Sequence, residues 1–382
     1  FKYKMLRRTF VLRRQFASSA SKKASSKGSS NAGREAVFID GCRTPFQMSG
    51  TGYKDLLGWQ LGRLALHGLA ERNPALDLKS VDRVIYGNVI QEVLTANVGR
   101  ESALAAGFPQ SVPANTVTMA CISSNLAAAN AVDAIRAGSG DTFVVGGVET
   151  MSDVPIRFSR ELRKRMIAST KIKSPAGYLK LLKGFKLNML APQLPPIAEF
   201  STNEVMGHSA DRLAATWGVG REDQDSYAMR SHLNAAQASE KGLLTDRLSL
   251  QTPNAISEDN GVKGDSTMEK LKKLKPAFIK PHGTVTAASS SFLSDGASAG
   301  LIMSEKAALA GGHKPRAYIR DYVFTGMDPK DELLLGPAYS TALLFKRNNL
   351  TIKDIDVWEI HEAFAGQVLA NLNALDSESF CT

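Results

Sequence analysis

The stretch from residue 116 to residue 138 constrains the fold more than any other part of the sequence. An apolar run leads into Cys121, and the residues that follow are rich in alanine and other small residues, up to a glycine at position 138. Alanine favours helix and glycine commonly ends one, so this pattern predicts a tightly packed helix that stops at Gly138. Cys121 then lies on the turn that enters the helix, close to the helix N-terminus.

Two interpretations of Cys121 follow from this position. The free N–H groups and the positive dipole end of a helix N-terminus favour a thiolate, which is the nucleophilic form of cysteine. Covalent catalysis needs such a nucleophile. The alternative is a buried structural cysteine, which is the commoner role of a lone free cysteine. The motifs elsewhere in the chain decide between the two interpretations.

Six further motifs accompany Cys121. They are a strand-like run at 142–149 followed by Met-Ser at 151–152, Met-Gly-His at 206–208, Lys-Pro-Ala-Phe at 275–278, Gly-Thr-Val-Thr-Ala at 283–287, Ser-Asp-Gly-Ala at 294–297, and His-Glu-Ala-Phe at 361–364. In this order they resemble the thiolase family, from about Ala36 to the end of the chain. The resemblance implies an α/β protein with the thiolase fold, in which two similar βαβ-type halves form layered sheets and helices (αβαβα).

The resemblance also implies how the chain divides. Residues 35–305 are expected to form the N-terminal thiolase domain with a basic loop insert at 156–275, and residues 313–382 a C-terminal domain whose half of the fold is incomplete. A weak internal repeat supports two halves. Val81-Asp82 and Ile355-Asp356 each follow a lysine at the same spacing, so 353–361 is expected to correspond to 79–87.

Positive charge is concentrated at the N-terminus. The 382 residues contain 47 lysines and arginines against 37 acidic residues, a formal net charge of +10. Ten of these basic residues lie in 1–34, which has no acidic residue, so the remainder is neutral and gives no case for binding DNA or RNA. An arginine-rich, serine-rich and acid-free segment is typical of a mitochondrial transit peptide. A disordered basic tail is the alternative.

A second basic stretch lies within the first domain. Ten lysines and arginines between residues 157 and 186 are accompanied by one acid, Glu161, and by several leucines. Basic amphipathic segments can lie on anionic membranes. We therefore expect contact with inner-membrane lipid through 157–186, with an ordinary solvated loop as the alternative.

Metal binding and disulfides are not expected. Cys42, Cys121 and Cys381 are too few and too scattered for a disulfide framework or a zinc site, and the histidines have no metal-ligand spacing. No uninterrupted apolar run is long enough to span a bilayer. We expect no metal and no cofactor, with coenzyme A as a substrate.

The family's reaction assigns roles to six positions. Thiolysis of a 3-oxoacyl-CoA needs a nucleophile, an oxyanion site and an acid for the departing enolate. The resemblance implies that Cys121 is the nucleophile and that His361 helps to form the oxyanion site; a structural hydrogen bond is the alternative for His361. Four other residues would bind substrate: Met206 and Phe364 along the acyl or pantetheine path (or simply in the core), Ser291 at the pantetheine arm, and Lys263 at the nucleotide end of CoA.

Two family motifs do not occur after His361. One is a Gly-His-Pro histidine that activates the nucleophile, and the other is a Cys-x-Gly cysteine that handles the enolate proton. Cys381 has no following glycine, so we do not give it this role. A general acid must be able to reach its proton. We therefore expect a C-terminally truncated chain with a reactive thiol and little thiolysis.

The resemblance implies a place in fatty-acid β-oxidation, in the mitochondrial matrix at the inner membrane. The implied partners are acyl-CoA, a second copy in a homodimer, and a trifunctional α subunit in a hetero-oligomer. Two alternatives stay open: a β-ketoacyl synthase-like condensing enzyme, which shares the fold and the cysteine, and a non-catalytic assembly subunit. The Met-Ser after Glu149 and the motif at 361–364 favour a thiolase over the condensing enzyme.

Overall fold

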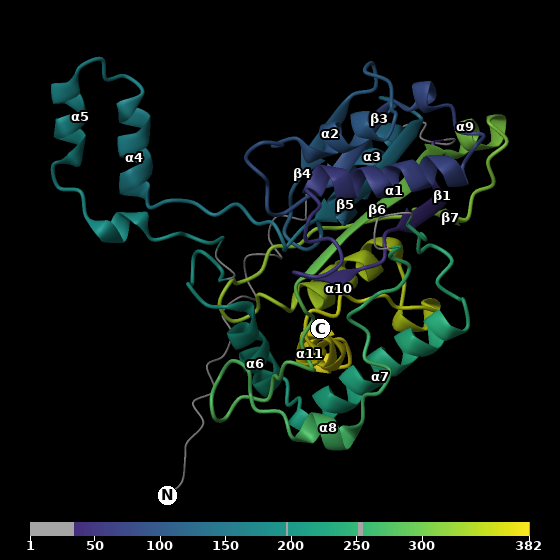
Figure 1. Cartoon of the computed structure of the whole chain (residues 1–382). Helices are drawn as coiled ribbons and strands as arrows, with labels where there is room; N and C mark the ends of the chain where they lie inside the picture. The colour runs from purple at the N-terminus through teal and green to yellow at the C-terminus, as the bar shows by residue number, and fades with distance from the viewer. Residues whose placement is uncertain (1–33, 196–197, 251–254, 382) are drawn as a thin grey trace, which may run out of the picture. The chain divides into compact units, whose positions relative to one another are not determined.

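The structure is a computed structural model that describes residues 34–195, 198–250 and 255–381 (Figure 1). The proposed transit peptide therefore lies outside the described residues, apart from Arg34. The strands are β1 (Ala36–Arg43), β2 (Gln47–Met48), β3 (Arg83–Gly87), β4 (Ala114–Val117), β5 (Thr142–Glu149), β6 (Ser294–Ser304) and β7 (Ala317–Tyr318). The helices are α1 (Gly58–Arg72), α2 (Val98–Ala105), α3 (Ser123–Ala137), α4 (Arg160–Ser169), α5 (Pro175–Leu182), α6 (Met206–Thr216), α7 (Arg221–Glu240), α8 (Met268–Lys272), α9 (Glu305–Ala310), α10 (Gly336–Asn348), α11 (Ala365–Leu375) and α12 (Glu378–Cys381), with the 3-10 helices η2 (Leu78–Ser80), η3 (Leu187–Leu190) and η4 (Ile352–Asp354).

The described strands form one mixed sheet in the order β4-β3-β5-β6-β1-β7, and β2 pairs with β6. β3 is parallel to β4 and β5, whereas β6 is antiparallel to β5 and β1. The predicted strand at 142–149 is confirmed and has the bounds of β5. Its apolar residues are buried along almost the whole strand, as expected for a strand with both faces covered.

Helices cover the two faces of the sheet because successive side chains of a strand point to opposite sides. On one face, Val84 and Val144 belong to the larger apolar cluster together with residues of α1 and α2. On the other face, Ile85 and Val145 belong to a cluster with α3. The alanine-rich face of α3 lets this helix lie close to the strands.

The predicted helix after Cys121 is confirmed as α3. It ends at Gly138, which has a left-handed backbone (φ 76°) that glycine adopts without strain. The start of α3 lies on Gly87, the last residue of β3. A Cβ atom at position 87 would come within 2.6 Å of the backbone carbon of Ser123, so only glycine fits there.

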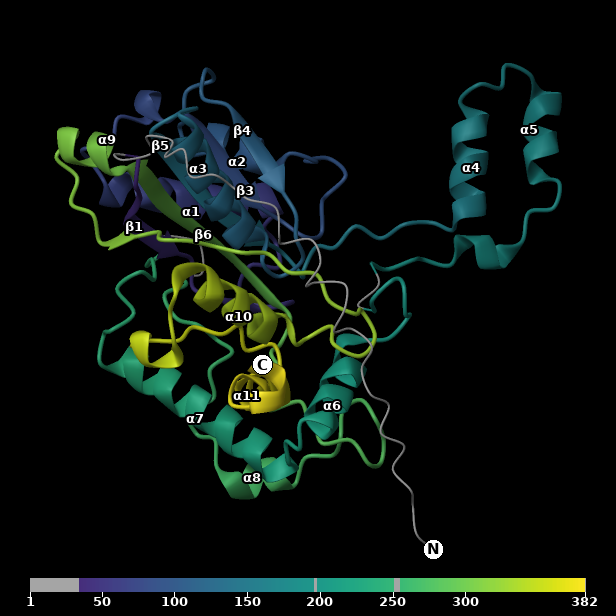
Figure 2. The ribbon, with the colours of Figure 1, turned by 180° about the vertical axis from the view of Figure 1, so that it is seen from behind.

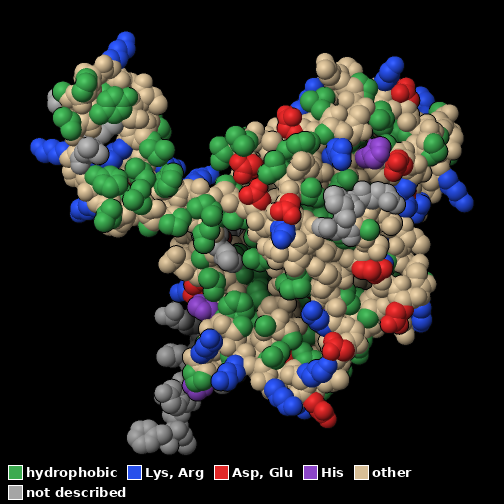
Figure 3. Space-filling model, in the orientation of Figure 1, with side chains coloured by type: hydrophobic (Ala, Val, Ile, Leu, Met, Phe, Trp, Pro, Cys, Tyr) green, Lys and Arg blue, Asp and Glu red, His purple; other side chains and the backbone are tan. Residues whose placement is uncertain are grey.

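The basic insert is helical. α4 contacts α5 and η3, and Figures 1 and 2 both show α4 and α5 side by side. No residue of α4 is buried. Figure 3 shows apolar and basic side chains gathered on this hairpin. Every helix of the described residues is too short or too polar to cross a membrane.

The C-terminal residues pack on α6 and α7. α11 lies beside α6, α7 and α10 (Figure 2). Apolar side chains of α6, α10 and α11 form a third cluster. The internal repeat holds for its first turn only: η2 and η4 occupy equivalent positions, at residues 78–80 and 352–354. β3 follows η2, but residues 355–360 lie in no strand of the described structure, and Val357 is 76% exposed. The correspondence of 353–361 to 79–87 therefore fails after the turn, because no neighbouring strand supplies hydrogen bonds to this segment.

Replacing Gly87 by alanine should destabilise the fold and displace the start of α3. The new methyl group would meet helix backbone, which cannot swing aside, and overpacking of this kind costs about 1–3 kcal/mol. Urea unfolding of Gly87→Ala measures the loss. Gly326→Ala is the matched control, because a Cβ atom there meets no atom within 4 Å and its unfolding free energy should hardly change.

Candidate active site

Cys121 and Ser291 belong to loops at the same edge of the sheet. The pairs Val117–Gly87, Gly87–Gly147 and Glu149–Gly296 place the ends of β4, β3 and β5 beside the beginning of β6. Cys121 follows β4 by four residues, and Ser291 precedes β6 by three. Ligands of open α/β sheets bind at this carboxyl edge.

A short, strained turn carries Cys121. Ser123 closes the turn, because its Oγ accepts the Met119 N–H at 2.8 Å and donates to the Ala120 carbonyl at 2.7 Å. Ala120 has φ 45°, a left-handed conformation that is costly for any residue with a Cβ atom. Such strain is concentrated at functional sites. The thiol of Cys121 is exposed, so the buried structural alternative is wrong.

Cys42 shows what a structural cysteine looks like in the same chain. Its side chain is buried and its Sγ donates to the Ala65 carbonyl at 3.4 Å. Burial raises the pKa of the Cys42 thiol to about 12, so this thiol stays protonated and inert. The side chain of Cys381 lies outside the described part of the structure.

The structure joins the segment of Ser291 to the segment of His361. The Ser291 N–H donates to the Ala363 carbonyl, and the Ala365 N–H donates to the Ser289 carbonyl, both at 2.9 Å. Ser289 and Ser290 use their hydroxyls within their own loop, where both contact Thr286. The Ser291 side chain is exposed and its hydroxyl makes no hydrogen bond within the described part of the chain, so it is free to meet a ligand.

Met206 and Phe364 belong to one apolar cluster with Phe278. The rings of Phe278 and Phe364 meet edge to face with centroids 6.0 Å apart, and Phe278 also lies directly over Gly207. Phe364 is 9% exposed, so the structure places it in the core, one of the two roles considered for it. Met206 is partly buried at the margin of the same cluster.

Asp211 is a residue of this region that the sequence analysis did not single out. Its buried carboxylate accepts the N–H groups of Thr284 at 2.7 Å and Val285 at 2.9 Å, and that of Ile279 at 3.3 Å. It thereby holds the loop between Phe278 and the serines. The signal in the sequence is an acid on the apolar face of a helix, between Ala210 and Leu213.

The loop of Lys263 is fixed from two sides. Gly261 is covered by the ring of Phe292, which leaves no room for a Cβ atom and ties this loop to the residue after Ser291. The Lys263 N–H donates to Nδ1 of His232 at 3.3 Å. Lys263 itself is exposed. The structure therefore brings the Lys263 loop and Ser291 to one surface.

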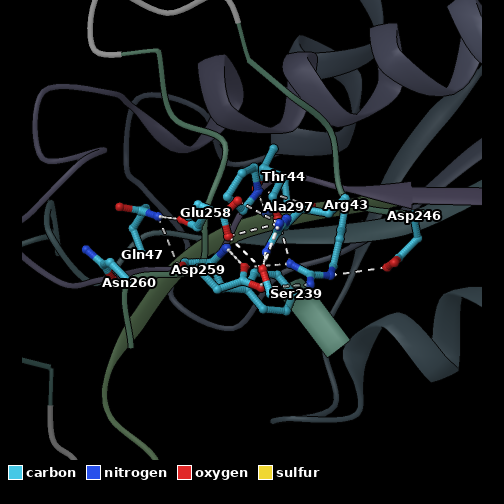
Figure 4. A network of polar contacts seen from close by, with 12 residues as sticks. Arg43, Thr44, Gln47, Ser239, Asp246, Glu258, Asp259, Asn260 and Ala297 are labelled. Atoms are coloured by element: carbon cyan, nitrogen blue, oxygen red, sulfur yellow. Dashed lines mark hydrogen bonds and ion pairs between the residues drawn. The ribbon is translucent and has the colours of Figure 1, made fainter. Parts of the chain in front are cut away.

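A partly buried ion pair anchors the same loop to the end of β1 (Figure 4). Two nitrogens of Arg43 donate to the two oxygens of Asp259, at 2.7 and 2.9 Å. Arg247 lies 3.5 Å from Asp259, and the Phe46 N–H donates to Asp259 at 2.6 Å. Asn260, the next residue, accepts the Met48 N–H.

The pKa of Asp259 reflects this environment. Burial acts to raise the pKa of the carboxyl group, but the Arg43 hydrogen bonds, the Phe46 N–H and the charges of Arg43 and Arg247 outweigh it. The pKa of Asp259 therefore lies below its ordinary value, and the carboxylate is charged in the folded protein. Glu149, which accepts the N–H groups of Val89 and Ile90, has the opposite balance, because burial dominates and raises its pKa.

The arrangement offers an exposed thiol, a histidine-bearing segment and free polar groups near one sheet edge. Five of the six predicted residues, all except Cys121, lie in segments that contact one another through 206–211, 261–263, 289–292 and 361–365. No hydrogen bond joins Cys121 to His361 in the described residues; these two share the sheet edge only through the loops around them. Among the described residues, no group of three or more His, Cys, Asp or Glu side chains could hold a metal ion.

Comparisons with known proteins match this architecture over nearly the whole described chain. The N-terminal domain of thiolases matches residues 36–306, and the C-terminal domain of thiolases matches residues 313–380. The bovine mitochondrial trifunctional enzyme subunit beta is 55% identical over 349 residues, which cover 91% of this chain and 73% of that protein. A probable 3-ketoacyl-CoA thiolase of Caenorhabditis elegans is 52% identical and covers 90% and 78% of the two chains.

Two solved structures have a fold similar to that of this chain. Human mitochondrial 3-ketoacyl-CoA thiolase in complex with CoA has a TM-score of 0.79 at 29% identity, over 91% of this chain and 84% of that chain. The acetyl-CoA acetyltransferase of Bacillus anthracis also has a TM-score of 0.79, at 31% identity.

Removing the charge of Asp259 should destabilise the protein. Asp259→Asn leaves the partly buried guanidinium of Arg43 with Asp246 as its remaining charged partner, and losing a hydrogen-bonded charged partner at such a site costs about 1–3 kcal/mol. Because the folded pKa of Asp259 is depressed, its stabilisation is present above the unfolded pKa of about 3.9 and is lost as the pH falls through the folded pKa. Urea unfolding should therefore show a large difference from wild type at pH 7 that shrinks below about pH 4.

Asp265→Asn is the matched control for this prediction. Asp265 forms an ion pair with Lys270 on the surface, where both side chains are exposed, and its loss should leave the unfolding curve unchanged. Equal stability of Asp259→Asn and wild type at pH 7 would contradict the role given to the Arg43–Asp259 pair.

Proposed function

This chain belongs to the thiolase family, and we propose from that premise, in place of the little thiolysis expected from the sequence, that it cleaves 3-oxoacyl-CoA by thiolysis in fatty-acid β-oxidation. The products are acetyl-CoA and a shortened acyl-CoA, and CoA is a substrate, so no further cofactor is needed. One observation carries the assignment of the site: the exposed thiol of Cys121 lies on a strained turn at the carboxyl edge of the sheet and the entrance to α3.

The chemistry runs through an acyl-enzyme. The thiolate of Cys121 attacks the C3 carbonyl carbon, a sulfur–carbon bond forms, and an electron pair moves to the carbonyl oxygen, where His361 donates a hydrogen bond. When the carbonyl re-forms, the C2–C3 bond breaks; its electron pair leaves with acetyl-CoA as an enolate, which takes up a proton from solvent. The thiol of CoA gives its proton to solvent, its sulfur attacks the acyl-Cys121 thioester, and the bond between the acyl carbon and Cys121 breaks to release the thiolate.

Two exposed polar side chains serve the CoA substrate. The Ser291 hydroxyl meets the pantetheine arm and Lys263 the nucleotide end. Support comes from the exposure of both side chains and from the contact of Phe292 with Gly261, which keeps the two loops together. Met206 lines the acyl path from the margin of the apolar cluster, and Phe364 forms the wall behind it.

Replacing Cys121 tests the function directly. Incubation with hexanoyl-CoA should add one acyl group to Cys121, detected by mass spectrometry, and Cys121→Ser should abolish both this adduct and cleavage of 3-oxoacyl-CoA. Cys42→Ser is the control, because the buried Cys42 should neither accept the acyl group nor react with iodoacetamide. Undiminished cleavage by Cys121→Ser would refute the assignment of the nucleophile.

The protein acts in an assembly. Its relatives include subunits beta of the mitochondrial trifunctional enzyme, which supports a complex with an α subunit. A homodimer is supported by the sheet edge: in the described structure β4 pairs with β3 alone, and Val93 and Leu94, in the loop between β3 and α2, are strongly exposed. An open strand edge with apolar neighbours favours pairing with a second copy.

The protein is mitochondrial, as are its relatives in mammals. We place it in the matrix and assign its import to residues 1–34. Deleting 1–34, or replacing their ten basic side chains by glutamine, should abolish import into isolated mitochondria, because the membrane potential drives positive charge inward. Import of both variants at the wild-type rate would rule out the transit peptide.

The α4–α5 hairpin attaches the protein to the inner membrane. Its support is composition and exposure: Arg160, Arg163 and Lys164 are exposed on α4, and Ile167 and Leu179 are exposed apolar side chains of the hairpin. Near an anionic surface each basic residue contributes about 1 kcal/mol, and this contribution is screened by salt.

Neutralising three charges tests the hairpin. Changing Arg160, Arg163 and Lys164 together to glutamine should weaken binding to cardiolipin-containing vesicles by about tenfold or more at low salt, with little difference at high salt. The control changes Lys54, Lys306 and Lys353 to glutamine, three exposed lysines outside the hairpin. Equal loss in both triple variants would show only a nonspecific charge effect and would defeat the proposal.

A further inference from the structure

Two hydroxyl groups of α7 hold one carboxylate beside His361. The Tyr227 hydroxyl donates to Oε1 of Glu362 and the Ser231 hydroxyl donates to Oε2, each at 2.6 Å. Residues four apart on a helix lie on the same face, so the two donors reach the carboxylate from neighbouring turns. Short hydrogen bonds to a carboxylate are strong ones, and using both oxygens fixes its orientation as well as its position.

The segment that Glu362 belongs to has little other support. Residues 355–363 lie between η4 and α11 and form no helix or strand, so they make no regular backbone hydrogen bonds. Trp358 packs edge to face on Phe345, and the Ala363 carbonyl accepts the Ser291 N–H. Between these two contacts, the hydrogen bonds of the Glu362 side chain attach the segment to α7, next to His361.

Tyr227 remains a donor over the physiological pH range. Burial raises the pKa of its hydroxyl group, and the hydrogen bond to Glu362 and the charge of Glu362 raise it further. The neighbour of Ser231 on the same helix, His232, accepts the Lys263 N–H. Burial and the charge of Lys263 lower the pKa of His232 against the opposing effect of Glu362, which keeps its ring neutral and able to accept. α7 thus contacts both the loop of Lys263 and the segment of His361.

We propose that Tyr227 and Ser231 are positioning residues of the acyl-transfer reaction. They hold Glu362, and through it the adjoining backbone of His361, so that the imidazole stands where the oxyanion forms. The inference rests on the proposed function, because it assigns α7 a role through His361. If the two hydrogen bonds had no positioning role, loss of the hydroxyls would change neither the order of residues 355–363 nor the rate of acyl transfer.

The first measurement is local. In the double variant Tyr227→Phe, Ser231→Ala, hydrogen exchange of the Ser291 and Ala365 amides, whose hydrogen bonds join this segment to the serine loop, should accelerate at least tenfold, whereas exchange in β5 should be unchanged. Tyr318→Phe is the matched control, because it removes a hydrogen bond from a tyrosine to Glu305 far along the chain from this segment. Unchanged exchange in the double variant overturns the proposal.

The second measurement is chemical. The rate constant for acyl transfer from hexanoyl-CoA to Cys121 should fall at least tenfold in the double variant, while alkylation of Cys121 by iodoacetamide keeps its wild-type rate. In the His361→Ala background the same double change should cause no further loss, because positioning residues act through the residue that they hold. Ser231→Thr, which keeps the hydroxyl, should retain most of the rate.

The outcomes separate this inference from the proposed function. If Cys121→Ser still accepts the acyl group, the proposed function fails whatever α7 does. If Cys121 is confirmed but the double variant transfers at the wild-type rate, or loses the same factor with and without His361, the positioning role is overturned. Faster exchange together with a slower, His361-dependent transfer supports it.

Discussion

The close approach of α3 to glycines at the ends of two parallel strands determines where the rest of the site can lie. Gly87 touches the backbone of Ser123, and Gly147 of β5 touches the side chain of Ser124. With any larger residue at Gly87 the helix would have to move away from the sheet, and the turn of Ala120 and Cys121 would move with it. The exposed thiol is thus placed by contacts of backbone on backbone, which are much stiffer than side-chain contacts.

Carboxylates that are buried or partly buried hold the loops around the site. Asp295 accepts the N–H groups of Met151 and Ser152, Asp211 holds the loop before the serines, and Asp259 holds the loop of Lys263. Each lies under a loop that has no strand or helix of its own to satisfy its backbone groups. A buried carboxylate with several donors meets that need, and its own burial is tolerated because every one of these donors approaches it closely.

Strands and helices were predicted well from the sequence, whereas the contacts between loops were not. Residues 142–149 form a strand with the predicted bounds because a strand buried on both faces is apolar along most of its length, a local property that can be read directly. The exposure of Cys121 and the meeting of 289–291 with 363–365 depend on contacts between residues far apart in the chain. Asp211 and Glu362 illustrate the limit, since an acidic residue in a sequence does not reveal which N–H or hydroxyl groups will surround it. Residues 355–360 have the residue spacing of a strand but form no strand in the described structure. A strand needs a partner strand for its backbone hydrogen bonds, and the pattern of one segment does not reveal whether such a partner lies beside it.

The ring of Phe292 has one further consequence. It follows Ser291 in the chain and rests on Gly261, two residues before Lys263, so the segments proposed for the two ends of CoA are locked by a single aromatic contact. A displacement of either segment must be shared by the other. This contact fixes the distance between the segments of Ser291 and Lys263. An acyl carrier with a shorter arm or without a nucleotide would therefore contact only one of the two segments. Discrimination among acyl carriers would then come from geometry rather than from the strength of either anchor.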